Sequence, residues 1–520
     1  MYCPKCNKEN PDDAKSCKSC GTALTQFGAL SKIEKFLEDN SRKMAELYGE
    51  EFADSSRWGP NLAALLILAY IDRDKVDKLW YKQASKIKKV TGESEKKLIV
   101  CSCHTGFLAH TGRALMVAQK LRELGHEVIF AVDTETKPDE KGKPTQRKYV
   151  ELIKEACFEI YHLPWLVGED TLMRGMQIKG GTMGYYNTRM IEEETGNMIS
   201  ILKEIEGKKK KPDIMLTDHA WVASIPADIM NIPVASLWNF LFTNYNRTKL
   251  SPPENHPIKK FFYKLGGDNL IELLEKLQMV KVILGILLLY WVIPYNLVRI
   301  KYMLKEKRFI KIKRNMYSQS CGDINLFPDY VAFGGMKINH KALPVGPILW
   351  EPEASAQDQQ LVSDFENFFA RDKEKPLIYV TMGDSGMLEL FKLIIEALKG
   401  KDYRVAITTG EQFDISELGK LPENFFAIPF YPGKEICKKA SLMINHGGSG
   451  SLNQAIQNRL PQISIPTHAD QQWNSDLVAR EGLGKQIFPG NLTAESLNAA
   501  IKELLPRKHG RCSASQECRD

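Results

Sequence analysis

The sequence has little of what marks a secreted protein or a partner of nucleic acid. Its N-terminus, Met1-Tyr2-Cys3-Pro4, has no apolar segment, so we expect no secretory signal there. The net charge of +7 over 520 residues is too small to argue for nucleic acid. Four of the eleven cysteines form one metal pattern and the others are scattered, which argues against disulfides. We expect a cytoplasmic protein of two or three domains, with the inner face of the membrane as the alternative location.

The sequence also lacks an apolar run that spans a bilayer with length to spare. The uncharged run 282–298 has 17 residues and contains Pro294, which puts it at the lower edge of the required length. Lys and Arg residues then dominate up to Arg314, against one acid, Glu306. An apolar wedge beside a cationic stripe is typical of a protein on an anionic membrane surface. Buried helices with a solvated face explain 282–314 equally well, and a true span is a third interpretation.

The first 24 residues contain two cysteine pairs, Cys3-x-x-Cys6 and Cys17-x-x-Cys20. Four thiolates in this spacing predict one closed, tetrahedral zinc site. So short a segment has almost no core, so the metal must supply its folding energy. No ligand position stays open, which argues against catalysis by this zinc. The segment resembles small prokaryotic zinc ribbons, and we favour a structural or protein-docking role over contact with nucleic acid.

The stretch 442–484 carries the strongest functional signal. It predicts a strand over Leu442–Asn445, a glycine-rich loop and a helix from Leu452. Such a loop lets the backbone approach a phosphate, which the free N–H groups of the helix then hold. The loop residues are His446, Gly447, Gly448, Ser449, Gly450 and Ser451. A second strand leads to a polar loop in which Asp470 and Gln471 could grip the hydroxyls of a sugar.

This spaced set resembles the donor-binding signature of the UDP-glycosyltransferase family. The signature has a His, two Gly, a Ser or Thr, an acidic residue, a Pro-x-x-x-x-Asp-Gln segment and an Asn. The resemblance implies a nucleotide-sugar donor bound by the residues just named. One position departs from the family: Gln454 stands where a Glu usually holds the donor ribose. Gln can bond a hydroxyl but carries no charge, which leaves the nucleotide preference open.

A second family-like segment lies near residue 110. The run 97–103 predicts a buried strand, 113–124 a helix and 126–132 the next strand, without a G-x-G-x-x-G pattern. His110 and Arg113 fall on a Gly-His-x-x-Pro/Arg motif that provides the catalytic base in the family, with Ala109 in place of Gly. A His suits this task because its pKa is ordinarily near neutrality. His104, in the same loop, is the rival candidate.

The segment Pro212–Trp238 resembles the family's Pro-Asp-x-x-x-x-Asp pattern. It predicts a strand over Ile214–Thr217 that ends at Asp218. In the family, the Asp at this place holds the catalytic His and stabilises the imidazolium, as in a hydrolase triad. Asp218 is our candidate for that role. An Asp that caps the next helix is the alternative, and the adjacent His219 could confuse the assignment.

The C-terminal half offers further donor contacts by resemblance. Strands are predicted over Leu377–Thr381 and Arg404–Thr408. The loop containing Gly383 and Ser385 stands where the family faces the donor phosphates. Phe430 stands where the family stacks an aromatic on the base, although Gly433 replaces a common Gln.

These observations predict an α/β protein of the GT-B architecture, with two Rossmann-like parallel-sheet domains facing across a cleft. We expect a zinc ribbon (1–24), a helical connector (25–95), an acceptor-binding domain (96–350), a nucleotide-sugar-binding domain (351–505) and a polar tail (506–520). The resemblance covers roughly residues 96–505.

The implied activity is inverting transfer of a hexose from a nucleotide-diphosphate sugar, which we expect to be UDP-linked, to a hydroxyl of an apolar or lipid acceptor. His110 would be the general base, with no catalytic metal. The expected partners are that donor, that acceptor, a membrane surface through 282–314 and a protein through the zinc ribbon, but no nucleic acid. The alternatives are a catalytically degenerate scaffold, which Gln454 and Gly433 favour, and a nucleotide-sugar epimerase or phosphorylase, which an intact His110–Asp218 pair disfavours.

Overall fold

The computed structural model describes most of the chain in two compact units. The described residues are 18–19, 28–73, 79–83, 96–135, 149–164, 188–248, 250–251, 254, 257–276, 279–350, 359–383, 386–410 and 412–505. One unit, here the N-terminal unit, comprises 36–352 and 467–474; the other, the C-terminal unit, comprises 1–35, 353–466 and 475–520. The four cysteines of the zinc pattern, Ser385 and the tail 506–520 lie outside the described residues.

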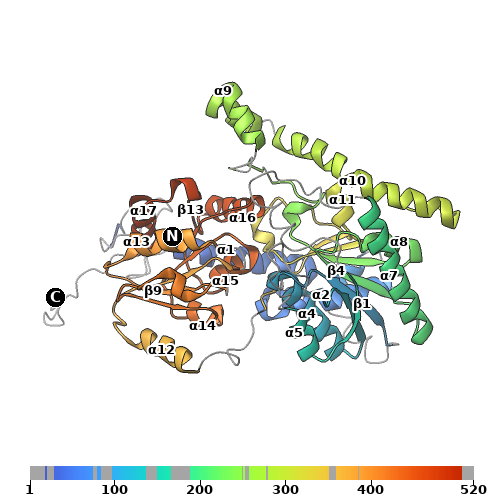
Figure 1. The fold of residues 1–520 in the computed structure, drawn as a ribbon, viewed down its shortest axis with the longest axis horizontal. Coiled ribbons are helices and arrows are strands. Elements are labelled where there is room, and N and C mark those ends of the chain that lie inside the picture. The colour runs from blue at the N-terminus through green and yellow to red at the C-terminus, as the bar shows by residue number, and fades with distance from the viewer. Residues whose placement is uncertain are drawn as a thin grey trace. The chain divides into compact units, whose positions relative to one another are not determined.

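A seven-stranded parallel sheet forms the centre of the N-terminal unit (Figure 1). The strand order is β3-β2-β1-β4-β5-β6-β7. The chain leaves β1 toward β2 on one side and later leaves β4 toward β5 on the other, so the order reverses between β1 and β4. Ligands of open α/β sheets bind at the carboxyl ends of strands at such a reversal. The bounds are β1 Leu98–Cys103, β2 Glu127–Val132, β3 Glu159–His162, β4 Ile214–Asp218, β5 Val234–Leu237, β6 Ile324–Phe327 and β7 Ala342–Pro344.

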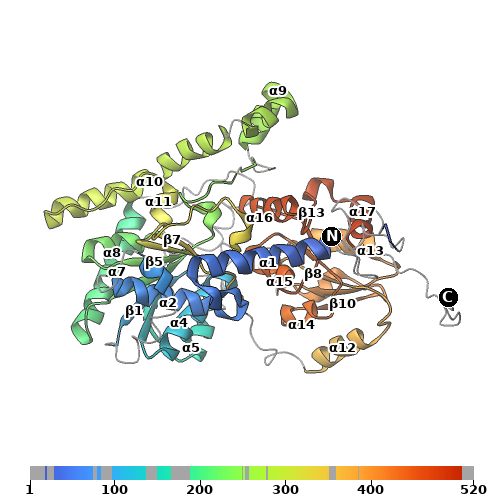
Figure 2. The ribbon, with the colours of Figure 1, turned by 180° about the vertical axis from the view of Figure 1, so that it is seen from behind.

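Helices bury the apolar residues of this sheet. α7 packs Met198, Leu202 and Ile205 against Leu98 and Val100 of β1. α4 also contacts β1 and lies beside α2, most of whose residues are buried (Figure 2). The helices are α1 Gly28–Tyr48, α2 Pro60–Ile71, α4 Leu108–Glu123, α5 Val150–Glu155, α7 Thr188–Lys208, α8 Ser224–Met230, α9 Pro257–Lys276, α10 Met279–Glu306 and α11 Met316–Ser320.

The run 282–298 lies within α10. No helix in the part of the chain that the structure describes is long and apolar enough to cross a membrane. The interpretation of this run as a membrane span is therefore wrong for the described helices. Some apolar residues of α10 are buried and others are exposed.

The C-terminal unit contains a six-stranded parallel sheet in the order β10-β9-β8-β11-β12-β13. Here the order reverses between β8 and β11, so the loops after these two strands meet at the carboxyl edge. The strands are β8 Leu377–Thr381, β9 Arg404–Thr408, β10 Phe425–Ile428, β11 Leu442–Asn445, β12 Gln462–Ser464 and β13 Gly484–Gln486. The helices are α12 Gln359–Ala370, α13 Leu388–Leu398, α14 Gly433–Cys437, α15 Ser449–Gln457, α17 Ala494–Leu504 and, from residue 475 on, α16 Ala469–Arg480.

The segment 467–474 belongs to the N-terminal unit although it follows β12 of the C-terminal sheet. Gln472 bonds the Ser251 hydroxyl at 2.9 Å and accepts from the backbone of Glu254 at 2.8 Å. Trp473 donates its indole N–H to the carbonyl of Ser251 at 2.9 Å and packs on Phe242. The first turn of α16 is thus held by residues that follow β5.

Two parallel-sheet Rossmann-like domains are the fold class that the sequence predicts, and this prediction is confirmed.

Candidate active site

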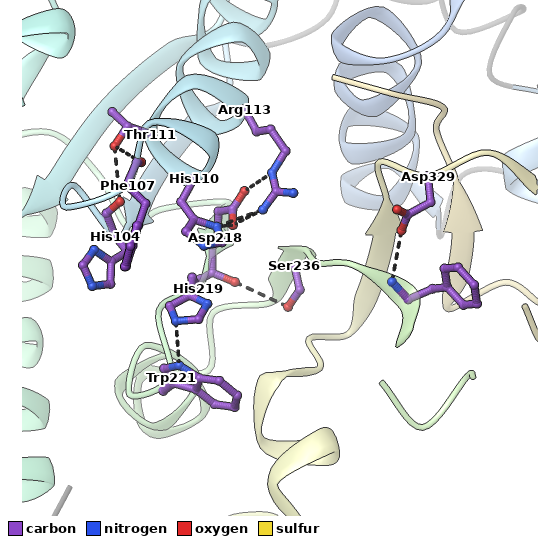
Figure 3. A network of polar contacts seen from close by, with 12 residues as sticks. His104, Phe107, His110, Thr111, Arg113, Asp218, His219, Trp221, Ser236 and Asp329 are labelled. Atoms are coloured by element: carbon purple, nitrogen blue, oxygen red, sulfur yellow. Dashed lines mark hydrogen bonds and ion pairs between the residues drawn. The ribbon is translucent and has the colours of Figure 1, made fainter. Parts of the chain in front are cut away.

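Asp218 is the centre of a polar cluster at the β1–β4 reversal (Figure 3). It is the last residue of β4, it is fully buried, and it pairs in register with Cys103 at the end of β1. His110 and Arg113 approach it from the first two turns of α4 (Figure 3). The His110 Nδ1 lies 2.7 Å from Asp218 Oδ1. The structure therefore brings together the two residues that the sequence proposes as base and partner.

Arg113 clamps both oxygens of the same carboxylate. Its Nε donates to Asp218 Oδ2 at 2.9 Å and its Nη2 donates to Oδ1 at 2.8 Å. Burial by itself would lower the pKa of Arg113, but the Asp218 carboxylate outweighs it and raises that pKa. Asp218 therefore bonds side chains of α4 through both oxygens.

The hydrogen bonds of His110 Nδ1 are mutually exclusive. Arg113 Nη2 lies 2.9 Å from this nitrogen, about as close as Asp218 Oδ1 does. An arginine only donates and an ionised carboxylate only accepts, so the Nδ1–H tautomer bonds Asp218 and the other tautomer bonds Arg113. The Nδ1–H tautomer leaves a lone pair on Nε2. The His110 side chain is 21% exposed, so the ring is partly open to solvent.

His219 is a stacked, neutral neighbour of His110. The two rings lie 4.5 Å apart with 28° between their planes, and the far face of His219 stacks on Trp238. Trp221 donates its indole N–H to His219 Nε2 at 3.3 Å. Burial, together with His110, His104 and Arg113, places the pKa of His219 well below its ordinary value. His219 therefore accepts a hydrogen bond and positions the ring of His110.

His104 occupies a different place from His110. It is buried after β1, and its Nδ1 accepts from the backbone N–H of Gly106 at 2.9 Å. Its ring packs on Phe107, and its centroid is 6.5 Å from that of His110. This geometry shapes the loop before α4 and favours His110 over its rival as the exposed base.

Asp329 is a further buried carboxyl in this region that the sequence reasoning missed. Its Oδ2 accepts from the backbone N–H of Phe240 at 3.1 Å (Figure 3). Burial raises the pKa of Asp329 to about 6, although the Phe240 hydrogen bond and Arg113 act in the opposite direction. No motif contains this residue. By contrast, His110 and Arg113 belong to one motif, and α4 places them three residues apart on the same helix, where their side chains can meet.

In the C-terminal unit, a buried asparagine shapes the glycine-rich loop between β11 and α15. Asn445 Oδ1 accepts from the N–H of Gly447 at 2.7 Å and from the Ser464 hydroxyl at 3.1 Å. Its amide donates to Gln462 at 2.8 Å. Three strand-end residues thus hold the turn, with Gly447 in the left-handed region at φ 83°.

Two glycines make room for the imidazole of His446. A Cβ on Gly448 would lie 2.3 Å from His446 Nε2, and one on Gly383 would lie 2.8 Å from Cε1. Gly383 also has a φ of 51°, which disfavours other residues. The loops after β8 and β11 therefore meet around His446, as the strand order requires. Ser385, expected in the same loop, lies outside the described residues.

The N-terminus of α15 offers free donors to an anion. α15 begins at Ser449, so Ser449, Gly450 and Ser451 form its first turn. Gly448 is the residue before the helix, and no side chain caps it. The first N–H groups of a helix have no partner within it, and the helix dipole favours negative charge there. This end of α15 can therefore bind a phosphate.

The two departures from the family signature lie against each other. Gln454 is buried in α15, and a Cβ on Gly433 would lie 2.6 Å from its Oε1. Gly433 begins α14 beside this amide. Because Gly433 has no side chain, it leaves the space that the Gln454 amide occupies. Phe430 is half-buried just before α14.

Asp470 and Gln471 lie in the first turn of α16. Gln471 is buried, and its Oε1 accepts from the Thr467 N–H at 2.8 Å and from the Thr467 hydroxyl at 2.9 Å. Asp470 is half-buried. This segment belongs to the N-terminal unit.

Comparison with known protein families gives a match at each end of the chain. Residues 392–520 match the family described as erythromycin biosynthesis protein CIII-like, C-terminal domain. Residues 2–24 match the zinc-ribbon domain family. The first match includes the whole His446–Ser451 loop, and the second includes all four cysteines of the zinc pattern.

Curated relatives extend over most of the chain. A PGL/p-HBAD biosynthesis glycosyltransferase of Mycobacterium tuberculosis is 24% identical over 401 residues, which cover 76% of this chain and 82% of the relative. A PGL/p-HBAD biosynthesis rhamnosyltransferase of Mycobacterium bovis is 23% identical over 413 residues, covering 79% and 81%. An uncharacterized UDP-glucosyltransferase of Bacillus subtilis, YdhE, is 30% identical over 135 residues, covering 26% and 34%.

Solved structures show the same fold. The glycotransferase of kitacinnamycin aligns with a TM-score of 0.51 at 16% identity, over 79% of this chain and 91% of that one. The spinosyn forosaminyltransferase SpnP aligns with a TM-score of 0.50 at 13% identity, over the same shares. The chain thus has the GT-B fold, and the relatives that align over most of it are named as glycosyltransferases. It carries an erythromycin CIII-like C-terminal domain and an N-terminal zinc ribbon, and the predicted resemblance is confirmed.

Proposed function

We propose that the protein transfers a hexose from a UDP-linked sugar to a hydroxyl of an apolar or lipid acceptor, with inversion at the anomeric carbon. The single observation that carries this proposal is the 2.7 Å contact between His110 Nδ1 and the buried carboxylate of Asp218. It orients a partly exposed imidazole so that Nε2 can take a proton from an acceptor. Relatives named for rhamnosyl and UDP-glucosyl transfer support a hexose donor.

The proposed reaction is a single displacement. His110 Nε2 accepts the proton of the acceptor hydroxyl, and the oxygen forms a bond to the anomeric carbon. The bond between that carbon and the diphosphate oxygen breaks on the opposite face, and the nucleoside diphosphate leaves with the electron pair. Asp218 offsets the charge of the imidazolium, and stacking on the neutral ring of His219 restrains its plane.

The donor side of the proposal rests on the loop around His446. The free N–H groups of α15 and the imidazole of His446 bind the diphosphate as its charge develops. Gln454 bonds the ribose, Phe430 stacks on the base, and Asp470 with Gln471 holds the sugar. The N–H groups of α15 and the imidazole of His446 thus stabilise the diphosphate without a catalytic metal. A single structural zinc is held by Cys3, Cys6, Cys17 and Cys20.

The test is a panel of nucleotide sugars, with thermal shift and donor hydrolysis measured for wild type, His110→Ala and the matched control His340→Ala. His340 is an exposed histidine of the same unit. We expect one donor to raise the melting temperature of all three proteins. Slow hydrolysis should be lost in His110→Ala and kept in His340→Ala.

The alternatives give different results in the same panel. No shift with any donor would refute the catalytic proposal in favour of a degenerate scaffold built on the zinc ribbon. Conversion of the donor sugar to its epimer would indicate an epimerase. Hydrolysis that survives in His110→Ala would remove His110 from the chemistry.

A further inference from the structure

The C-terminal half of α10 is apolar on two different faces. Val292, Tyr295 and Val298 are buried in one cluster with Trp221 and Ile225, so one face packs on the N-terminal unit. This accounts for the buried part of the 282–298 run. Other apolar residues of α10 are exposed.

The second face carries an exposed apolar row. Its members are 37–72% exposed and follow one another at intervals of four, three and four residues, which places them along one side of a helix. They are Ile293, Leu297, Ile300 and Leu304. A helix of a soluble protein ordinarily turns polar residues outward, so an apolar row with this period predicts a partner.

The chain after α10 widens this apolar surface. Residues 308–313 return along the helix, because Asn296 bonds the backbone of Lys313 twice, at 2.8 and 3.0 Å. The returning segment exposes Phe309, at 78%, and Ile312. The exposed residues of α10 and of this segment form what we call the α10 surface.

Cations surround the α10 surface. Lys301 follows Ile300 and Lys305 follows Leu304, each about 100° further round the helix, so a row of lysines runs beside the apolar row. Lys307, Lys311 and Arg314 are also exposed. Between residues 292 and 314, all of them described, Glu306 is the single acid. The ion pair of Lys301 with Glu192 is exposed and therefore weak.

We propose that the α10 surface docks the protein on an anionic lipid bilayer. The apolar row enters the boundary between headgroups and acyl chains, while the flanking lysines reach the anionic headgroups. An apolar row with a cationic border complements such a surface in both chemistry and charge. This inference stands apart from the proposed function, since it needs neither a donor nor His110. If both hold, docking brings a lipid acceptor to the enzyme.

The test is flotation of the full-length protein with vesicles of neutral phosphatidylcholine and with vesicles that also contain phosphatidylglycerol. Two variants address the two parts of the surface: Leu297→Ser with Leu304→Ser, and Lys301→Gln with Lys305→Gln. The matched control is Leu393→Ser with Lys392→Gln. These two residues are exposed on α13, and Leu393 is as exposed, at 47%, as Leu297.

We expect wild type and control to bind the anionic vesicles and to release them at high salt. The lysine variant should bind about 30-fold more weakly, since each lysine near an anionic surface contributes about fivefold. The leucine variant should lose at least tenfold in binding. Unchanged melting temperatures would show that the variants fold.

Three results would overturn the inference. One is the absence of binding to anionic vesicles. Another is an equal loss of vesicle binding in the control variant and in the α10 variants. The third is a wild-type dimer that the leucine substitutions dissociate. In that case a second copy of the chain, and not a bilayer, would cover the α10 surface.

Discussion

The strongest stability prediction concerns Arg113→Ala. The substitution leaves the Asp218 carboxylate buried without the two hydrogen bonds, of 2.9 and 2.8 Å, that Arg113 donates. Breaking a buried ion pair by removing one partner costs about 3–5 kcal/mol, because the remaining charge is uncompensated. We therefore expect the free energy of unfolding of the N-terminal unit to fall by about that amount.

Tryptophan fluorescence reads this unit alone. All eight tryptophans of the sequence lie in 36–352 or 467–474, the two segments of the N-terminal unit. Urea denaturation followed at this signal therefore isolates the relevant transition from that of the C-terminal unit. Such isolation matters, since a protein of several domains need not unfold in one step.

Two further variants make the reasoning refutable. Arg113→Ala combined with Asp218→Asn removes the charge as well, and should recover a large part of the lost stability. Lys120→Ala, which breaks the exposed pair with Glu123 on the same helix, should cost less than about 1 kcal/mol. A loss below 1 kcal/mol in Arg113→Ala, or a double variant no more stable than it, would refute the account of the clamp.

Three other predictions test separate parts of the structure. The folded pKa of Asp329, about 6, lies above its ordinary 3.8, so its contribution to stability is lost as pH rises from about 4 through about 6. Asp329→Asn keeps the oxygen that accepts from the backbone N–H of Phe240. The substitution should therefore raise the free energy of unfolding of the N-terminal unit by up to about 3 kcal/mol at pH 7 and leave it unchanged near pH 3. Urea denaturation at these two pH values measures the difference. Gly448→Ala should displace His446 without unfolding the protein. Calorimetry should then show donor binding weakened about 10–100-fold, since a hydrogen bond to a charged group contributes about 1.5–3 kcal/mol. Unaltered donor binding would contradict the phosphate role of His446. A thiol-reactive reagent with a zinc indicator should release one zinc per chain, and Cys17→Ser should abolish this release.

The sequence predicted the C-terminal sheet closely because its strands are continuous buried runs. β8, β9 and β11 have the predicted bounds, Leu377–Thr381, Arg404–Thr408 and Leu442–Asn445. Each stands between turn residues and has both faces covered, so periodicity and flanking signals agree. The loop after β11 is shorter than predicted: the helix was expected from Leu452, whereas α15 begins at Ser449 and takes Ser449, Gly450 and Ser451 into its first turn.

The start of α4 was predicted wrongly for an instructive reason. The predicted helix spans 113–124 and leaves His110 in the preceding loop, whereas α4 begins at Leu108 and includes His110 in its first turn. Gly112 is a buried residue within this helix, and a Cβ there would lie 2.7 Å from Trp350, so the packing explains the glycine. This close packing joins residues more than 200 positions apart, and no local pattern could reveal it.

The site shows the same division between local and distant information. His110, Asp218 and the His446 loop were available as motifs. The stacking of His219 on His110, the clamp of Arg113 on Asp218 and the proximity of Gly433 to Gln454 depend on the tertiary fold. Each of these contacts joins different elements, so it becomes visible only when the sheet order is known.

The most direct test of the central claim is chemical rescue of His110→Ala. Turnover of the donor identified in the panel would be measured for wild type, His110→Ala and Asp218→Asn, with and without added imidazole, while calorimetry follows donor binding. We predict that His110→Ala keeps donor binding, loses about 10²–10⁴-fold in turnover, and recovers part of it with imidazole. Asp218→Asn should lose turnover without rescue, because its base is present but misoriented. Full turnover in His110→Ala, or a loss that imidazole leaves unchanged while donor binding disappears, would contradict the assignment of His110 as the general base.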